Sequence, residues 1–416
     1  MIRWLVISLA LCLGTVPATA EPAPLTLADC YRLALAQSET LAIHQELIAE
    51  AEARFALAFS TLLPRVSFVS SDKRQDGTGS SAFTLRHVPE RKFTLSQPLF
   101  SGFREFAALR GSQAEQAQRR LEKSRAAQRL LMDVADAFYL ALELRDDLAA
   151  LGMIQEALAA RLDDLTAREQ IGRSRPSEVV SAQAALRRVE AEAYEVRSQQ
   201  VVARHLMEFL TGIEPLGPLA DAEPVLPVVQ AESAYLAKAI GQPGVQAVEQ
   251  AARVAQEGVA VAGADRWPAV SLDGNYYLER VGTAKDMDWD ATLEVDVPIF
   301  QGGEVTGAIQ AAESQARQAD WEVSAARRAA VRDVRDRHAQ VTAAIAQADA
   351  LTRALEATAE SYRLQVEDYD RSLVNHLEVL QTLQALQDVR RDAVHAAYEA
   401  KRSVWRLRAS VGEIPA

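Results

Sequence analysis

The sequence has little of what most catalytic and metal sites are made from. It holds 2 cysteines and 6 histidines in 416 residues, and Cys12 falls in an amino-terminal segment that we expect to be removed. Cys30 then remains alone, which excludes a disulfide within one chain, and its amphipathic surroundings predict a small buried apolar role. His376 and His395 come closest to a pair, and we expect both on solvated helix surfaces. With no Ser-His-Asp, Cys-His, zinc or phosphate-loop motif, we predict no enzyme, no metal and no cofactor.

The chain also has fewer basic than acidic residues. Lys and Arg total 45 against 57 Asp and Glu, which gives a formal net charge of -12 at pH 7. Binding to nucleic acid depends on basic side chains that neutralise phosphates. The composition therefore argues against a nucleic-acid partner.

Long apolar runs are confined to the amino terminus. Residues 1–20 combine one basic residue, Arg3, with an apolar stretch and a small-residue pattern at 18–20, which is typical of a cleaved export signal. We expect the mature chain to begin near Glu21. The run is shorter than the ~20 residues of a membrane-spanning helix, which disfavours an uncleaved anchor. Cys12 lies inside the run and not at the cleavage point, so we expect no lipoprotein anchor.

What the chain does contain is a duplication. Residues that set structure recur 200 positions apart: Pro98, Phe100 and Gly102 in QPLFSGF become Pro298, Phe300 and Gly302 in VPIFQGG. The same offset relates Glu178-Val179, Leu186, Val189 and Ala193 to Glu378-Val379, Leu386, Val389 and Ala393. One supersecondary unit used twice accounts for this agreement. We therefore expect a signal peptide at 1–20, a first repeat at 21–215, a linker at 216–235 and a second repeat at 236–416.

Proline is missing from two long stretches, 103–170 and 303–370, which are rich in Ala, Leu, Glu, Gln and Arg. That composition favours helix, and each stretch would span roughly 100 Å. Apolar residues recur every three or four positions, at Leu144, Leu148, Leu151, Leu158, Leu162 and Leu165, and again at Val179, Ala182, Leu186, Val189, Ala193 and Val196. Such stripes are typical of coiled-coil packing. We expect helical hairpins that turn at the polar breaks IGRSRPSE (171–178) and YDRSLVNHLE (369–378).

Four segments alternate with a period of two, which predicts strands. The pattern is clear at 270–279 and 289–297 and weaker near 65–72 and 91–99. The polar positions of the clear pair include Asp273, Asn275, Glu279, Asp290, Glu294 and Asp296. The apolar positions include Val270, Leu272, Tyr276, Leu278, Trp289, Leu293, Val295 and Val297, with Val66, Phe68, Phe93 and Leu95 in the weaker pair. The polar, glycine-containing segments 70–90 and 280–288 are predicted to be exposed loops.

A transmembrane barrel accounts for strands with one apolar and one acidic face. A lone hairpin is marginal in water, and no apolar stretch after residue 20 approaches the length of a membrane helix. The apolar face would meet lipid and the acidic face a wet lumen, where carboxylates favour cations or simply keep the wall hydrated. Phe100, Trp267, Trp289 and Phe300 lie at strand ends, as an aromatic girdle or as ordinary packing beside a turn. Four strands are too few to close a barrel, so several copies must share one.

Short motifs mark every junction along the chain. They are TLADCYRLALAQSETL near the start, LLPRVSF and WPAVSLDG between helix and strand, QPLFSGF and VPIFQGG between strand and helix, and SEVVSAQAAL and LEVLQTLQAL after the hairpin turns. In this order and spacing they resemble the TolC-type outer-membrane efflux proteins over essentially the whole mature chain. The junctions themselves carry Pro64, Pro98, Gly102, Pro268, Pro298 and Gly302.

The resemblance implies an architecture: a homotrimer with a twelve-stranded barrel, four strands from each chain, prolonged by a periplasmic tunnel of helices. In that shape the helices expected at 176–212 and 239–266 would stack end to end and together span what the continuous helix at 103–170 spans. The segment between them would form a belt around the middle of the tunnel.

The resemblance also implies an inner gate held by a tyrosine, an arginine and acidic residues near the hairpin turns. The matching positions carry Tyr369, Glu178 and Glu378. The arginine position is Val374 and a further acidic position is Gln381, so the ionic latch of the family is not reproduced in full. Arg175 and Arg371 are nearby substitutes or, alternatively, solvated turn residues. An exposed ion pair would contribute only ~0–1 kcal/mol.

The function implied by the resemblance is a passive exit duct across the outer membrane. Cargo would enter from an inner-membrane pump of the ABC, major-facilitator or resistance type through a periplasmic adaptor, as in a tripartite efflux pump or type I secretion. The alternative is that the chain is itself a periplasmic adaptor, a class that also has a coiled-coil hairpin after an export signal. An adaptor would show one hairpin between two halves of a glycine-rich β domain. The sequence does not specify whether the cargo is a drug, a metal or a secreted protein.

Overall fold

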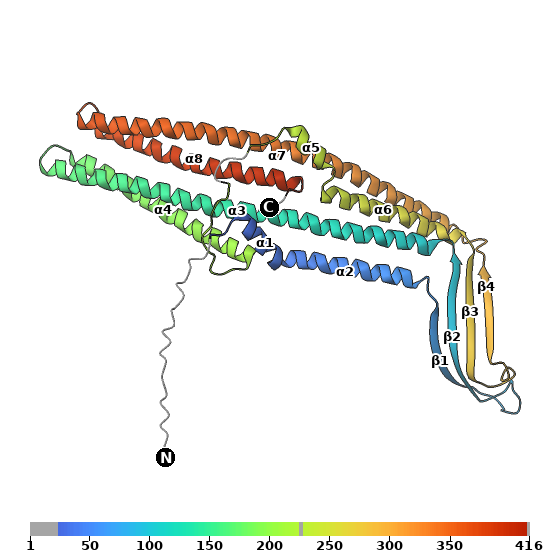
Figure 1. Ribbon diagram of the computed structural model, residues 1–416. Helices are drawn as coiled ribbons and strands as arrows, with labels where there is room; N and C mark the ends of the chain where they lie inside the picture. Colours follow the sequence, from blue (N-terminus) through green and yellow to red (C-terminus); the bar gives the residue numbers. More distant parts are fainter. Residues whose placement is uncertain (1–23, 224–227, 414–416) are drawn as a thin grey trace, which may run out of the picture.

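The computed structural model describes residues 24–223 and 228–413 of the chain, which form one elongated molecule (Figure 1). The strands stand at one end, two helical hairpin turns lie at the other, and long helices run between them. The expected export signal at 1–20 lies outside the described residues. Among the described helices, none is both long and apolar enough to cross a membrane.

Two long helices confirm the predicted duplication. α3 (Arg104–Gln170) and α7 (Glu304–Asp370) are each 67 residues long and begin 200 positions apart. Each turns at its predicted polar break and returns, as α4 (Pro176–Thr211) and as α8 (His376–Ser410). Pro176 is the first residue of α4, where its missing N–H leaves no hydrogen bond unmade.

The helices form a single curved layer (Figure 1). Towards the sheet, α3 packs between α2 (Glu39–Ser60) and α6 (Pro243–Gly263), and α7 packs on the far side of α6. Towards the turns, α3 packs between α4 and α8, and α7 packs on the far side of α8. The short helix α1 (Leu27–Gln37) contacts α3 and α4 at the middle of the layer. The layer therefore has two free edges, one made by α2 and α4 and the other by α7.

The predicted end-to-end stack of the two short helices of the first half is wrong. α6 continues from α8 instead, since Gln242 and Gly244 line the same cavity as Ala409 and Ser410. The helix that contacts α4 in place of α6 is α1. After α4 the chain crosses from one flank of α3 to the other, so α6 lies beside α3 on the same flank as α8 and not on that of α4.

That crossing path is held by contacts to three helices. Arg145 of α3 donates to the carbonyl of Leu219 at 3.3 Å, and Asp221 forms an ion pair with Lys401 of α8. α5 (Glu232–Ala239) then packs on α7. Residues 212–223 and 228–239 thus belong to a transverse segment that crosses the middle of the layer, where a belt was expected. Because Gly241 and Pro243 follow α5, the helix predicted to start at 239 starts at Pro243.

The sheet has the order β1-β2-β3-β4, and all neighbouring strands are antiparallel. Its strands are β1 (Arg65–Arg74), β2 (His87–Ser101), β3 (Ala269–Arg280) and β4 (Trp289–Asp296). All four predicted strands are confirmed, and the pairing of β2 with β3 joins the two halves of the chain.

The predicted loop at 70–90 is too long, because β1 and β2 extend into it at both ends. The sequence pattern placed the start of β2 near residue 91, whereas the strand begins at His87. The additional residues include Pro89, and proline usually marks a strand edge. Pairing between β2 and β3 begins at Glu90, so at Pro89 strand β2 has a neighbour on one side only. A proline is tolerated there because it interrupts no two-sided ladder.

The largest buried cluster lies at the middle of the molecule, where the transverse segment crosses. Phe138 and Tyr139 of α3 pack there with Tyr31 of α1, Met207 of α4 and Trp405 of α8. The indole Nε1 of Trp405 donates to the hydroxyl of Tyr139 at 3.1 Å. Cys30, on α1, is fully buried in this cluster, as the sequence predicted.

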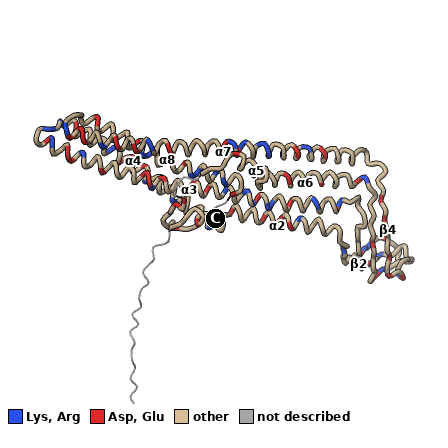
Figure 2. Tube along the Cα trace, turned by 45° about the horizontal axis from the view of Figure 1, so that its top comes forward, with Lys and Arg blue, Asp and Glu red and all other residues tan. Residues whose placement is uncertain are grey.

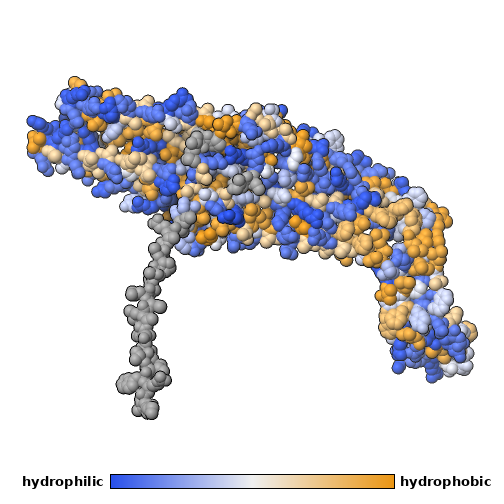
Figure 3. Space-filling view, in the orientation of Figure 1, coloured by the Kyte–Doolittle hydropathy of each residue, from blue (hydrophilic) through white to orange (hydrophobic). Residues whose placement is uncertain are grey.

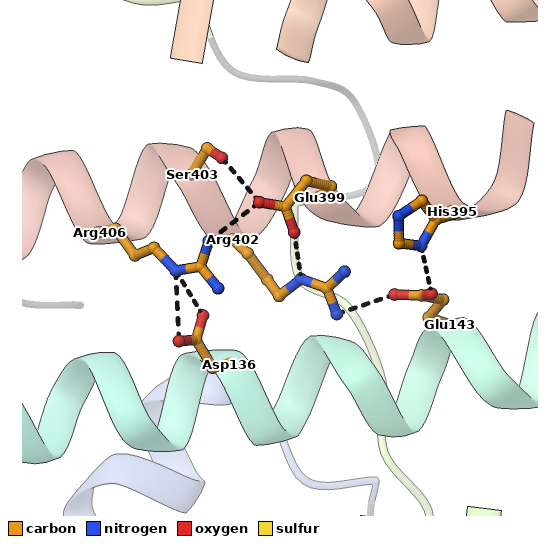
Figure 4. Close-up of polar contacts among 7 residues, drawn as sticks. All are labelled: Asp136, Glu143, His395, Glu399, Arg402, Ser403 and Arg406. Atoms are coloured by element: carbon orange, nitrogen blue, oxygen red, sulfur yellow. Dashed lines mark hydrogen bonds and ion pairs between the residues drawn. The ribbon is translucent and has the colours of Figure 1, made fainter. Parts of the chain in front are cut away.

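Charged side chains also tie α3 to α8 beside this cluster (Figure 4). Arg402 of α8 is buried and forms ion pairs with Glu143 of α3 at 2.8 Å and with Glu399 of its own helix at 2.9 Å. Arg406 pairs with Glu399 at 2.9 Å and with Asp136 of α3 at 3.0 Å. Because α3 belongs to the first half and α8 to the second, this network joins the two repeats.

Candidate functional site

Five of the six predicted polar side chains share one face of the sheet. Asn275 pairs in register with Asp290 and donates to its carboxylate at 2.7 Å, and the hydroxyl of Tyr277 donates to the same carboxylate at 2.8 Å. Ser271 donates to Asp273 at 3.0 Å. Glu294 and Asp296 follow Asp290 at alternate positions, which points them to the same side. The sequence pattern therefore located this face correctly for every predicted residue except Glu279.

Basic side chains at the loop end of the sheet were not anticipated. Arg91 of β2 forms an ion pair with Glu279 at 2.5 Å. Lys92 and Arg280 lie over the ring of Tyr277, with their charged groups 5.4 and 4.2 Å from its centroid. A register shift between Arg91 and Lys92 separates these contacts. Lys92 and Arg280 lie with Tyr277 on the polar face, whereas Arg91 lies two positions before Phe93 and so shares the opposite face with its partner Glu279. The sequence pattern therefore assigned Glu279 to the wrong face, because strict alternation does not record the shift. The six predicted residues had been chosen from β3 and β4 alone, so these contacts of β2 were missed.

The opposite face of the sheet is apolar and uncovered. Val270 pairs with Val295, Leu272 with Leu293, and Tyr276 with both Phe93 and Trp289. Phe68 packs on Phe93 with 5.3 Å between ring centroids, yet remains 53% exposed, and Trp289 is 69% exposed. Apolar residues form a broad patch over the strands near the helices, and the loop end is hydrophilic (Figure 3). Such a face needs an apolar environment outside the chain.

The aromatic residues at the strand ends differ in their surroundings. Phe100 meets Phe103 edge to face at 5.1 Å between centroids, which is ordinary local packing. Trp267, Trp289 and Phe300 are exposed by 57%, 69% and 88% respectively. The side chains of Trp267, Trp289 and Phe300 can therefore contact groups outside the chain, whereas Phe100 packs within it.

Each strand-to-helix corner contains two successive residues in the left-handed conformation. Gly102 and Phe103 have φ of 62° and 63°, and Gly302 and Gly303 have φ of 59° and 90°. A Cβ added to Gly102 would lie 2.4 Å from the carbonyl oxygen of Ala264, so only glycine fits.

The junction prolines flank the strands, with one exception. Pro64 precedes β1, Pro268 precedes β3 and Pro298 follows β4. Pro98 lies inside β2, at a register shift against β3, where the ladder is already interrupted.

The hairpin turns at the other end bring Tyr369 against two arginines of the neighbouring hairpin. The guanidinium Cζ of Arg161 lies 3.7 Å from the centroid of its ring, and that of Arg168 lies 5.0 Å away. Arg168 also forms an ion pair with Asp370 at 3.1 Å. Figure 2 shows charged residues of both signs concentrated at these turns. The basic partners of Tyr369, the predicted gate tyrosine, thus come from α3 and not from the turns.

The predicted acidic gate residues act within their own turns. Glu178 accepts a hydrogen bond from the hydroxyl of Ser174 at 2.7 Å and another from the backbone N–H of Arg175 at 3.3 Å. The bond from Ser174 is the main cause of the lowered pKa of Glu178. Glu378 meets Asn375, which caps α8 by accepting from the Glu378 N–H at 3.1 Å. Both carboxylates sit at helix amino termini, where a negative charge is favourable.

The two substitute arginines do not reach Tyr369. Arg175 is exposed beside Glu178, and Arg371 is exposed with its nearest carboxylate, Glu367, 4.0 Å away. The positions of Arg175 and Arg371 agree with the alternative interpretation, in which both are solvated turn residues. Arg161 and Arg168 could have been recognised from their seven-residue spacing, which puts two cations on one helix face next to the turn.

One expectation for the histidines is wrong. His395 is exposed and its Nδ1 lies 2.7 Å from Glu143 (Figure 4), but His376 is only 3% exposed. His376 is the first residue of α8, and the neighbouring hairpin covers it, which no local pattern reveals. Within residues 24–223 and 228–413, no group of three or more His, Cys, Asp or Glu side chains is arranged to hold a metal.

Comparison with known proteins gives consistent matches. The model of the family described as outer membrane efflux protein matches residues 30–212 and 239–413. The outer membrane protein TolC of Vibrio cholerae serotype O1 is 24% identical over 316 residues, which cover 72% of each chain. Protein CyaE of Bordetella pertussis is 25% identical over 420 residues, which cover 96% of this chain and 88% of that protein. The crystal structure of the outer membrane protein VceC of Vibrio cholerae has a TM-score of 0.81 and 17% identity over 93% of this chain and 96% of that one.

Proposed function

The chain belongs to the outer membrane efflux protein family, and we propose that it is the exit duct of a tripartite efflux pump or a type I secretion system. Cargo would pass from an inner-membrane pump through a periplasmic adaptor into this protein and leave across the outer membrane. The observation that carries the proposal is the sheet, with one uncovered apolar face and one carboxylate-rich face, continued by a helical layer. The alternative that the chain is itself the adaptor has no support, because its relatives are outer membrane channel proteins.

The assembly we propose is a homotrimer in which copies join edge to edge. The sheet ends in two unpaired strands, β1 and β4, and the helical layer ends in α2 with α4 on one side and α7 on the other. Unpaired strand edges cannot remain in lipid, because every backbone group there needs a partner. Joining β4 of one copy to β1 of the next satisfies both edges. Three copies give twelve strands, which exceeds the eight needed for the smallest barrel of this kind.

The helical edges support the same assembly through their charge. An exposed stripe on α2 contains acidic and apolar residues three and four positions apart: Glu39, Ile43, Glu46, Glu50, Ala53 and Leu57. An exposed stripe on α7 has the same spacing and is basic: Trp321, Ala325, Arg328, Arg332 and Arg335. The basic run is visible on α7 beside α5 in Figure 2. Opposite charges on two edges that must meet favour their association.

The two stripes also lie at the same height. Lys123 of α3 donates to Gln45 of α2 at 2.7 Å, so the neighbouring Glu46 lies at the same height along the layer as Lys123. On the other side, Arg110 of α3 pairs with Glu257 of α6 at 2.8 Å, and Arg327 of α7 pairs with Glu249 of α6 at 2.6 Å. Counting along the helices at ~1.5 Å per residue brings Arg332 about level with Lys123. Glu46 and Arg332 are therefore matched partners across the proposed contact.

The lumen of the barrel would be lined by the polar face of the sheet. Asp273, Asn275, Asp290, Glu294 and Asp296 would then face water, and the apolar face would meet lipid. Glu279 and its partner Arg91 lie on the other face, so the negative charge of the lumen comes mainly from Asp273, Asp290, Glu294 and Asp296. We propose that the channel prefers cations. We also propose that residues 1–20 are removed on export and that no lipid is attached.

The assembly is tested with a charge-swap pair. Arg332→Glu and Glu46→Arg should each reduce the yield of a heat-dissociable trimer extracted from outer membranes, and the double variant should restore it. Arg129→Glu is the matched control, because Arg129 is exposed on α3, which has helices on both sides and belongs to neither edge. The proposal fails if wild-type protein purifies as a monomer that is soluble without detergent, or if trimers of all four proteins form no ion-conducting channels in planar bilayers.

A further inference from the structure

A buried polar cluster lies between the two helical hairpins, close to their turns. It contains Arg161 of α3, Gln365 and Tyr369 of α7, and His376 of α8. The side chain of Arg161 is 10% exposed and His376 is 3% exposed. Among the described residues, no hydrogen-bond partner reaches Nε or Nη2 of Arg161, Oε1 of Gln365 or either ring nitrogen of His376. Buried polar atoms without partners are costly, so this is a weak point in the contact between the hairpins.

The charged groups around His376 make a second positive charge unfavourable. Arg161 faces it from α3, Glu178 faces it from α4, and the aromatic residues Tyr362 and Tyr369 approach Arg161 from α7. Burial is the main reason why the pKa of His376 is lowered, the charge of Arg161 lowers it further, and Glu178 acts in the opposite direction. The carboxylate of Glu178 is already hydrogen-bonded to Ser174 and to the Arg175 backbone. It therefore offsets only part of the repulsion.

We propose that the contact of His376 with the Arg161 cluster is a proton-sensitive junction, which holds the hairpin turns together at neutral pH and releases them in acid. This inference rests on the proposed function, because it assigns a trigger to the inner end of the duct. Neutral His376 fits the buried site. Protonation puts a second cation beside Arg161 and pushes α8 away from α3.

The direction of the pH effect follows from the folded and unfolded states. A histidine whose pKa is lowered by folding leaves stability unchanged above its ordinary value of about 6.5 and reduces it as the pH falls below that value. The loss is concentrated where His376 lies, between the hairpins. Besides the contacts of Tyr369 with Arg161 and Arg168, an exposed ion pair joins Arg168 to Asp370 across the turns, with side chains 33% and 59% accessible. It contributes only ~0–1 kcal/mol and cannot hold the turns alone.

The test measures the distance between the turns in the purified trimer. Spin labels are attached at Ile171→Cys and Leu373→Cys, which replace residues 66% and 69% exposed, while the native Cys30 is buried and stays unlabelled. Distances are recorded by pulsed electron resonance from pH 7.5 to pH 5. We expect a longer distance at low pH with a midpoint below 6.5. His376→Gln should abolish the change, and His395→Gln, on the same helix but exposed, should keep it.

Two further variants keep the test decisive if His376→Gln fails to assemble. Arg161→Gln removes the repelling charge and should raise the midpoint towards 6.5, whereas Glu178→Gln should lower it. A distance that does not change with pH in the wild type, or a change that survives His376→Gln, overturns the inference. These results are independent of conductance, so a duct with a fixed distance refutes only the junction. A protein that conducts at no pH refutes the proposed function instead.

Discussion

The guanidinium of Arg161 lies over the ring of Tyr369, with 3.7 Å between its Cζ atom and the ring centroid. The two residues belong to different repeats, so this contact joins the hairpins next to their turns. The side chain of Arg161 is almost fully buried, and cation–π contacts are strongest where the cation has lost its water. The tip of the molecule is therefore held by an aromatic contact with an arginine from α3, and the charges at the turns add little.

Replacing the tyrosine should loosen the turns. Tyr369→Leu removes a desolvated cation–π contact that is worth about 2 kcal/mol, and Arg161 is left without its aromatic partner. We expect a higher open probability at pH 7.5 in planar bilayers. Tyr194→Leu is the matched control, since Tyr194 is 69% exposed and its arginine neighbour, Arg197, lies 5.9 Å from the ring. Equal open probabilities for wild type and Tyr369→Leu would contradict the role of this contact.

The central core should depend on one hydroxyl group. Tyr139→Phe removes the acceptor of the Trp405 indole N–H, which then stays buried without a partner. We expect a loss of about 1–3 kcal/mol in the free energy of unfolding, measured by denaturant titration of the solubilised protein. Tyr194→Phe removes a hydroxyl from an exposed ring and should change that free energy by less than about 0.5 kcal/mol. Similar losses for the two variants would argue that the buried bond has no special weight.

Cys30 should be chemically silent in the folded protein. Burial is the main reason why the pKa of its thiol is raised to about 12. Since only the thiolate reacts with iodoacetamide, we expect no labelling at pH 8 in the native state and complete labelling after denaturation. Mass spectrometry of the intact chain measures both. Rapid labelling without denaturant would show that α1 detaches readily from the core.

Ion selectivity should follow the carboxylates of the sheet. Asp273→Asn, Glu294→Gln and Asp296→Asn in one variant remove three negative charges from the polar face while keeping the shape of each side chain. We expect the preference for cations over anions to fall, as measured by the reversal potential in a salt gradient. Glu195→Gln, on α4 and outside the sheet, should leave it unchanged. An unaltered reversal potential in the triple variant would mean that these carboxylates only hydrate the wall.

The elements set by local sequence were predictable, and those set by distant contacts were not. The two 67-residue helices follow from a lack of proline, and the strand faces follow from alternation at positions such as Asp273 and Leu272. The stacking of α6 on α8 depends on where the chain crosses after Thr211, which local periodicity does not record. The same limit applies to the predicted gate, where the family resemblance pointed to Tyr369. Its partner Arg161 and the buried His376 meet only after both hairpins are in place.

The strand-to-helix corner at Gly102 has a mechanical consequence. Its left-handed φ of 62° and its close approach to Ala264 fix the angle at which α3 leaves the sheet. A helix of 67 residues is a lever roughly 100 Å long, so an error of one degree at its base displaces its far end by about 1.7 Å. Faithful alignment of the distant turns therefore begins at the sheet, with a residue that has no side chain at all.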